Sequence, residues 1–318
     1  MSLLEVKNLS VEFGTGDSKG LAVRNNSFSL EKGKTLGIVG ESGCGKSVSA
    51  FSILQLISAP GKITSGEIFY KGEDLLKKTE DQMRAIRGKD IAMIFQEPMT
   101  SLNPVFTIGY QLIEGIMLHL NMNKKEAQRY AIEMLNKVGI PSPQKRIHSY
   151  PHEFSGGMRQ RVMIAMALSA SPDILIADEP TTALDVTIQA QILDLLLELQ
   201  EQEDMSMIMI THDLGIVANV ADDVAIMYAG EVIEEATVRD VFENAQHPYT
   251  KGLFAAIPHI GETKENLSTI SGTVPSLNKE PEGCVFYPRC YNKADECIVQ
   301  SIPLLGKGHK VRCVRVSD

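Results

Sequence analysis

A glycine-rich loop between an apolar strand and an apolar helix is the feature that most constrains how this chain folds. Residues 36–40, LGIVG, form a short run rich in β-branched residues, which is typical of a buried parallel strand. The loop GESGCGKS at 40–47 fits the pattern G-x-x-x-x-G-K-[ST], and the apolar residues 48–57 after it are expected to form a buried helix. Strand, glycine loop and helix in this order predict a P-loop.

The residue types in this loop suit a bound phosphate. Glycines allow backbone N–H groups to turn inward around an anion, and the N-terminus of the following helix adds its dipole. Lys46 can reach the β- and γ-phosphates, and the Ser47 hydroxyl can bind Mg²⁺. The sequence therefore predicts that the chain binds a nucleoside triphosphate with Mg²⁺. The predicted nucleotide-binding residues of the loop are Gly40, Ser42, Gly43, Cys44, Gly45, Lys46, Ser47 and Val48.

Composition and charge narrow the class of protein. The chain has 318 residues, 43% of them hydrophobic and 22% charged, so we expect a globular protein with one large domain or two ordinary ones. Its net charge of −9 argues against a broad nucleic-acid interface. The N-terminus has no signal-peptide pattern, and no apolar run approaches the length of a membrane span. We expect a cytoplasmic protein, or one held at a membrane by other chains.

The pattern along the chain predicts an α/β fold. Strands alternating with helices indicate a mostly parallel sheet covered by helices, with a helical insertion at about 97–170. Within the insertion, Asn123 is expected to cap a helix over 123–140 that Gly139 and Pro141 end. From about 245 onward the periodicity fades. Strands are predicted at 3–13, 27–31, 66–75 (with a turn), 91–96, 173–178, 206–211 and 222–230, and a second helix at 187–202.

Polar side chains follow three of the predicted strands and could act on the phosphates. Phosphoryl transfer needs an acid to organise Mg²⁺ and a group to activate water. In the strand ILIADEP, Asp178 suits the first task and Glu179 the second. His212 follows the next buried strand and could reach the γ-phosphate. Gln96 ends a strand at the sheet edge where ligands of α/β folds gather, so its amide could touch Mg²⁺ or the attacking water.

A second helix start also offers an anion site. In FSGGMRQR, Ser155 is expected to cap an apolar helix, while Gly156 and Gly157 permit close backbone approach. The chain has one P-loop, so this second phosphate-binding end has no obvious ligand within it. The simplest arrangement is that it faces the P-loop of a second subunit.

Together these motifs resemble the nucleotide-binding subunit of an ABC transporter. GESGCGKS, the signature FSGGMRQ, the strand ILIADEP, the D-loop ALD and the switch THD occur in that family's order over roughly 1–250, the expected ABC ATPase domain. Phe154 stands where the family usually has Leu, and Met158 stands where it often has Gln. Both changes leave the Ser-Gly-Gly core of the signature intact. The resemblance implies that Phe13 stacks on adenine and that Asp185 contributes with the signature across a dimer of ATPases.

Further segments resemble the dipeptide/oligopeptide permease branch of that family, namely EPMTSLNPVFTIGYQL, YPHEFSGGMRQRV, HPYTKGLFAAIP and EGCVFYPRC. This resemblance implies an importer ATPase at the cytoplasmic face of the membrane. Its partners would be two membrane permeases, a second ATPase subunit that is commonly a different chain, and an extracytoplasmic binding protein. The coupling surface is expected near Gln96, at 97–104. The alternatives are an importer of nickel or another small solute, a soluble ABC ATPase without a transport role, and an exporter subunit.

Four of the five cysteines lie close together in the C-terminal region, 251–318, which we expect to be an extension. Cys284, Cys290, Cys297 and Cys313 have the spacing C-x₅-C-x₆-C-x₁₅-C, which is not that of a zinc ribbon. Four thiolates can hold a [4Fe–4S] cluster or one tetrahedral zinc ion, and a reducing compartment disfavours disulfides. Some members of the permease branch carry a four-cysteine iron–sulfur cluster. The expected fold is a P-loop NTPase (RecA-like) core with an antiparallel β subdomain, a helical insertion and a small metal-binding extension.

Overall fold

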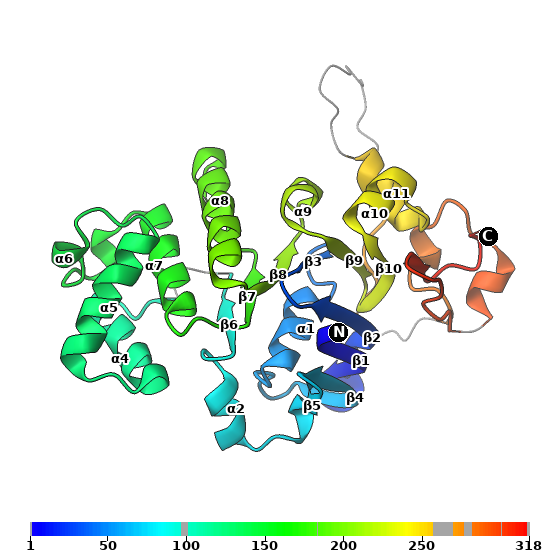
Figure 1. The fold of residues 1–318 in the computed structure, drawn as a ribbon. Helices are drawn as coiled ribbons and strands as arrows, with labels where there is room; N and C mark the ends of the chain where they lie inside the picture. Colours follow the sequence, from blue (N-terminus) through cyan, green and yellow to red (C-terminus); the bar gives the residue numbers. More distant parts are fainter. Residues whose placement is uncertain are drawn as a thin grey trace. The chain divides into compact units, whose positions relative to one another are not determined.

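A computed structural model describes residues 2–96, 101–182, 184–256, 270–276, 282–299 and 301–316, without the side chain of Asp17. The chain divides into two compact units, drawn in Figure 1, and we describe each by itself. The first unit comprises Met1–Leu30, Leu36–Leu76 and Thr211–Asp318, and the second comprises Glu31–Thr35 and Lys77–Ile210.

An antiparallel sheet forms one part of the first unit. Its strand order is β2-β1-β4-β5, and β1 pairs with β4 in a register that places Leu4 opposite Tyr70 and Val6 opposite Ile68. These four side chains are buried, so the sheet presents an apolar face to the core. The strands are β1 (Ser2–Phe13), β2 (Gly20–Glu31), β4 (Lys62–Tyr70) and β5 (Glu73–Asp74).

The strand that leads into the P-loop is β3 (Thr35–Val39), and all of its residues are buried, as expected for a central parallel strand. β3 pairs parallel with β9, β9 pairs antiparallel with β10, and β10 pairs antiparallel with β11. A Cβ on Gly37 would lie 2.8 Å from Cγ1 of Val217, so glycine allows helix α9 (Leu214–Val220) to pack closely on β3. The other strands are β9 (Asp223–Tyr228), β10 (Glu231–Thr237) and β11 (Lys310–Val311).

The helices of the first unit flank these strands. They are α1 (Lys46–Ile53), α9 (Leu214–Val220), α10 (Val238–Asn244) and α11 (Pro248–Ala255). Short 3₁₀ turns are η1 (Gly16–Ser18), η2 (Leu75–Lys77) at the boundary between the units, η4 (Tyr287–Arg289) and η5 (Asp295–Ile298).

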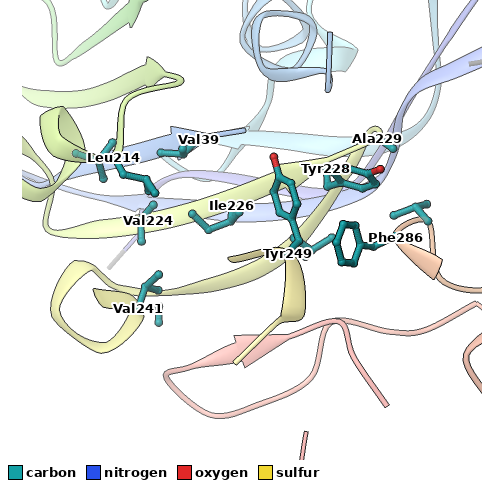
Figure 2. Packing of buried hydrophobic residues seen from close by; sticks show 13 residues of the cluster. Val39, Leu214, Val224, Ile226, Tyr228, Ala229, Val241, Tyr249 and Phe286 are labelled. Carbon is teal, nitrogen blue, oxygen red and sulfur yellow. The ribbon is translucent and has the colours of Figure 1, made fainter. Parts of the chain in front are cut away.

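The C-terminal region shares the hydrophobic core of the first unit. Phe286 is 2% exposed and packs edge-on against Tyr228 of β9, with 5.2 Å between the ring centroids, and against Tyr249 of α11 at 5.5 Å (Figure 2). The same cluster contains Val285 and reaches Val39 of β3. Residues around 286 therefore bury their apolar side chains against the strands and helices that also support the P-loop.

The second unit contains three parallel strands, which are hydrogen-bonded neighbours in the order β8-β7-β6. Its three strands lie within a residue or two of the predicted bounds, and the fully buried β7 and β8 agree with the expected buried parallel strands. They are β6 (Ile91–Ile94), β7 (Ile174–Asp178) and β8 (Ser206–Thr211).

Helices make up most of the rest of the second unit, and α4, α5 and α7 pack on one another (Figure 1). The predicted cap of α5 is confirmed: Oδ1 of Asn123 accepts hydrogen bonds of 3.1 Å from the N–H groups of Lys125 and Glu126. Gly139 follows the helix with φ of 75°. The helices are α2 (Glu80–Ile86), α4 (Ile108–Leu120), α5 (Lys124–Lys137), α6 (Pro143–Arg146), η3 (Pro151–Glu153), α7 (Gly156–Leu168) and α8 (Val186–Glu203). Among the described residues, none of the helices has the length and apolarity needed to cross a bilayer.

Candidate functional site

The P-loop connects β3 to α1, as the sequence predicts. Glycine is required at two of its positions by close backbone approach, because a Cβ on Gly40 would lie 2.2 Å from the carbonyl oxygen of Met227 and one on Gly45 would lie 2.4 Å from that of Ala22. Gly45 also has φ of 101°, in the left-handed region, immediately before α1 begins. The loop is thus formed against the end of β9 and against β2.

Lys46 lies inside the curve of this loop. Its side chain is buried, and Nζ donates hydrogen bonds to the carbonyl oxygens of Gly40 at 2.7 Å and Glu41 at 3.1 Å. Ser42 and Gly43 are exposed, Cys44 is buried, and Ser47 and Val48 in the first turn of α1 are partly exposed. The arrangement brings a cation and a helix N-terminus to one loop, which is the local chemistry that a phosphate group needs.

Two of the predicted catalytic residues meet in the second unit. Nε2 of Gln96 donates a hydrogen bond to Oε2 of Glu179 at 3.0 Å, and the hydroxyl of Thr182 donates to the same oxygen at 3.0 Å. Glu179 has φ of 45°, which is uncommon for a residue with a side chain, and its N–H bonds the carbonyl of Ile210 in β8. Asp178, the last residue of β7, is buried.

His212 and Phe13 belong to the first unit. His212 is exposed in the turn after β8, where Asp213 caps α9 by accepting a 2.7 Å hydrogen bond from the N–H of Gly215. Phe13 ends β1 and lies against Gly61, where a Cβ would come within 2.5 Å of Cε1 of the ring. The roles of both residues at a nucleotide stay predictions.

The signature residues begin helix α7 of the second unit. Oγ of Ser155 accepts a hydrogen bond from the N–H of Met158 at 3.3 Å, which confirms the predicted cap. A Cβ on Gly157 would lie 2.8 Å from Cγ2 of Ile188 in α8, so this glycine is needed for helix packing inside the unit. Asp185 likewise caps α8, accepting from the N–H of Ile188 at 3.0 Å. Ser155 and Gly156 are exposed.

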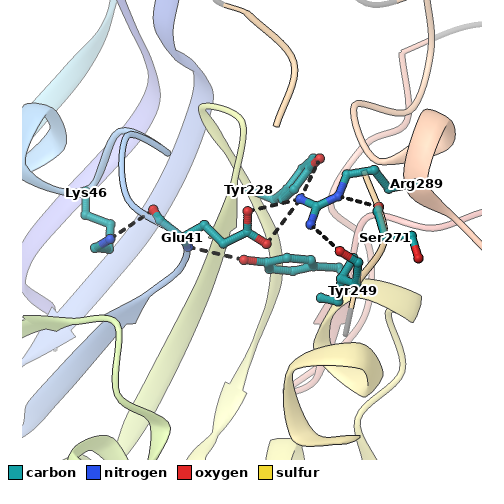
Figure 3. Close-up of polar contacts among 7 residues, drawn as sticks. Glu41, Lys46, Tyr228, Tyr249, Ser271 and Arg289 are labelled. Carbon is teal, nitrogen blue, oxygen red and sulfur yellow. Dashed lines mark hydrogen bonds and ion pairs between the residues drawn. The ribbon is translucent and has the colours of Figure 1, made fainter. Parts of the chain in front are cut away.

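Sequence reasoning missed two residues that contact the P-loop, Tyr249 of α11 and Arg289 of the C-terminal region. Arg289 forms an ion pair with Glu41 of the loop, 3.0 Å from Nη1 to Oε2, and the hydroxyl of Tyr249 accepts a hydrogen bond from the N–H of Glu41 (Figure 3). Glu41 and Arg289 are 248 positions apart, so no spacing rule could connect them. The only local signal was an arginine beside a cysteine in an otherwise aperiodic segment.

The four clustered cysteines lie within electrostatic reach of one another. The pKa of the Cys284 thiol is raised to about 11, first by burial and then by the neighbouring sulfurs, and burial followed by such neighbours also raises the pKa of Cys290 and Cys313. All of them are free thiols. Within the described ranges, however, no group of three or more His, Cys, Asp or Glu side chains is placed to hold a metal ion. The structure therefore does not support the expected metal-binding extension, because thiols near one another do not by themselves form a coordination geometry.

Comparison with known proteins identifies two family models in this chain. The model described as ABC transporter matches residues 23–182, about half of the chain, and that described as oligopeptide/dipeptide transporter, C-terminal region, matches 233–297. The dipeptide transport ATP-binding protein DppD of Bacillus subtilis (strain 168) is 52% identical over 98% of this chain and 94% of its own length. The oligopeptide transport ATP-binding protein OppD of the same organism is 54% identical over 89% of this chain and 80% of its own.

The chain is also similar to solved structures of ABC proteins. A dimeric structure of the ATP-binding cassette MJ0796, in a post-hydrolysis state bound to ADP and Pi, has a TM-score of 0.67 and 28% sequence identity. It covers 74% of this chain and 99% of that one. The structure of cbiO1 from Clostridium perfringens, part of the ABC transporter complex cbiONQ, has a TM-score of 0.64 and 26% identity over 76% of this chain and 91% of that one.

Proposed function

The chain belongs to the ABC transporter family of ATPases, and from this premise we propose that it is the ATP-hydrolysing subunit of an importer of dipeptides or oligopeptides. The observation that carries the proposal is similarity along nearly the whole chain, at 52% identity, to a dipeptide transport ATP-binding protein. The match to the C-terminal region of oligopeptide/dipeptide transporters supports the same branch.

The proposed chemistry assigns one task to each group. The ammonium of Lys46 and the N–H groups of the loop hold the phosphates, while Gln96 orients water and Glu179 accepts its proton as the water attacks the γ-phosphate. His212 contacts the γ-phosphate in this proposal, and Phe13 stacks on adenine. What supports the pairing of Gln96 with Glu179 is their direct hydrogen bond in the second unit.

Mg²⁺ would be held by oxygen atoms, the ligands that this ion prefers. By residue type, the Ser47 hydroxyl, the Asp178 carboxylate and the Gln96 amide are the proposed oxygen donors. When bound, Mg²⁺ neutralises charge on the phosphates and supports departure of the leaving oxygen.

A second ATPase subunit, identical or paralogous, would complete each nucleotide site. The exposed N-terminus of α7, with Ser155, Gly156 and Gly157, can offer N–H groups to a γ-phosphate, and Asp185 lies at the start of the next helix. ATP held between two such subunits would draw them together, and hydrolysis would release them.

The coupling surface to the two membrane permeases is proposed at 97–104, at the cytoplasmic face of the membrane. Residues 97–100 lie outside the described part of the chain. Just beyond them Val105 is 69% exposed, and the exposed rings of Phe106 and Tyr110 stack 4.6 Å apart. Exposed apolar and aromatic side chains of this kind favour a protein partner. An extracytoplasmic binding protein would deliver the solute to the permeases.

For Cys284, Cys290, Cys297 and Cys313 we propose a shared thiolate site with a structural role, for a [4Fe–4S] cluster first and zinc second. What supports it is that Cys290, Cys297 and Cys313 all lie near enough to Cys284 to help raise the pKa of its thiol. Among the described residues, these side chains are not placed to hold a metal ion, so metal binding would require them to shift. No step of ATP hydrolysis is assigned to this site.

The deciding experiment is ATP hydrolysis by the chain assembled with its permeases in lipid nanodiscs. With the binding protein present, we expect dipeptides or oligopeptides to raise the rate of phosphate release. Stimulation by Ni²⁺ or another small solute instead of peptides would assign the chain to a different importer. Failure to assemble with any permease, with hydrolysis retained, would favour the non-transport alternative.

A further inference from the structure

The N–H, the carbonyl oxygen and the carboxylate of Glu41 in the P-loop all form hydrogen bonds. Its N–H donates to the hydroxyl of Tyr249 at 3.2 Å, its carbonyl oxygen accepts from Nζ of Lys46 at 3.1 Å, and its two carboxylate oxygens accept from Nη1 of Arg289 at 3.1 and 3.0 Å (Figure 3). Lys46, which is proposed to bind phosphate, and Arg289 of the C-terminal region therefore both contact Glu41.

Arg289 is held on every side of its guanidinium group. Nε donates to the carbonyl oxygen of Ser271 at 3.0 Å, Nη2 donates to that of Ile270 at 3.0 Å, and Nη1 also donates to the hydroxyl of Tyr228 at 3.3 Å. The group lies 5.6 Å from the centroid of the Tyr228 ring, and its side chain is only 6% exposed. An arginine fixed in this way is unlike a surface ion pair, whose partners move and are screened by water.

The supporting tyrosines are part of the hydrophobic core. Tyr228 and Tyr249 are both buried, with 4.7 Å between their ring centroids, and both pack against Phe286 (Figure 2). Phe286 and Arg289 come from the same short segment of the C-terminal region. That segment therefore contributes an apolar anchor and, three positions later, the cation that contacts the P-loop.

We infer that Arg289 is a positioning residue for nucleotide binding, which acts on the P-loop through Glu41. The inference rests on the proposed function, because it supposes that the loop binds the phosphates of ATP. A loop held in its binding conformation loses less conformational entropy when the phosphates bind, so affinity rises without direct contact between Arg289 and the ligand. Through this ion pair, the C-terminal region sets the affinity of the ATP site.

The test is the dissociation constant of MgADP, measured by isothermal titration calorimetry on the full purified chain. The variants are Arg289→Gln, Glu41→Gln and the double variant. Arg239→Gln is the matched control, because it removes a guanidinium from an exposed ion pair with Glu243 on α10. We expect each single variant to raise the Kd about tenfold, within the ~5–150-fold range typical of coupling between sites, and the control to leave it unchanged.

The double variant separates positioning from a structural role. If the two side chains act as one unit, the double variant binds no more weakly than either single variant. Equal Kd values for Arg289→Gln and the wild type would overturn the inference, even if the melting temperature falls. Should Arg289→Gln fail to fold, Glu41→Gln decides alone, since it keeps the N–H and carbonyl contacts. A wild-type chain that binds no MgADP would instead contradict the proposed function.

Discussion

The side-chain amide of Gln96 donates a 3.0 Å hydrogen bond to the carboxylate of Glu179, joining the second residue after β6 to the residue that follows β7. The hydroxyl of Thr182 donates to the same oxygen. Because β6 and β7 are parallel neighbours, their carboxyl ends meet at one edge of the sheet. The carboxylate proposed as general base therefore has a fixed orientation, which proton transfer requires.

Replacing Glu179 by Gln should abolish turnover and keep ATP binding. The amide has nearly the same shape but cannot accept a proton from water, and loss of a general base typically costs about 10²–10⁴-fold in rate. Phosphate release by the assembled transporter measures the rate, with Glu198→Gln as the control because that side chain is exposed on α8. Near-normal hydrolysis by Glu179→Gln would reassign the base.

Replacing Lys46 by Ala should weaken nucleotide binding itself. Its ammonium is buried within the loop, and hydrogen bonds from charged groups contribute about 1.5–3 kcal/mol, which corresponds to roughly a tenfold to hundredfold rise in Kd. Calorimetry with MgADP gives this value directly. Lys7→Ala, at an exposed lysine of β1, is the control. An unchanged affinity in Lys46→Ala would remove this residue from the phosphate site.

Local patterns predicted much of the fold. The P-loop, its flanking strand β3, the strand β8 and the helix α5 lie close to their predicted positions, since hydrophobic periodicity and capping residues act over a few positions. The helix predicted at 48–57 is found as α1, which spans Lys46–Ile53 and so begins and ends earlier than predicted. The placement of Gln96 and Glu179 at one sheet edge could also be predicted from topology. Their direct hydrogen bond could not, because strand periodicity predicts neither side-chain contacts nor the φ of 45° at Glu179.

Contacts between distant segments could not be predicted from the sequence. The ion pair between Glu41 and Arg289 depends on how the C-terminal region folds onto β9 and α11, and a single sequence carries no spacing signal for such a pair. For the four clustered cysteines, the sequence predicts proximity but not geometry. Their clustering in sequence correctly indicates that the thiols lie near one another, but it does not fix their sulfur atoms in a coordination geometry.

The cap of α5 offers a stability test that does not depend on function. Asn123 accepts two backbone hydrogen bonds, and its own N–H donates to the carboxylate of Glu126, so Asn123→Ala should lower the free energy of unfolding by about 1 kcal/mol. Chemical denaturation measures the change. Asn136→Ala, at an exposed position in the same helix, should have no such effect. Equal losses in both variants would show that the cap is not the cause.

Without ATP, the isolated chain should be a monomer of about 35 kDa, because the proposed dimer is held by ATP between the P-loop of one subunit and α7 of the other. Light scattering measures the mass. Adding MgATP to the Glu179→Gln variant should shift the mass toward a dimer if the partner can be a second copy. A stable nucleotide-free dimer through the α7 face would contradict the proposed cycle.

The last prediction concerns the four clustered cysteines. Burial raises the thiol pKa of Cys284, Cys290 and Cys313. Metal ligands must be deprotonated, so a bound metal competes with protons and should be lost as the pH falls. Anaerobically purified protein should be brown with broad absorbance, and Cys290→Ser should remove the colour while leaving MgADP binding measurable. Colourless protein with stoichiometric zinc would reject the cluster and keep the site. Protein that holds neither iron nor zinc would reject both.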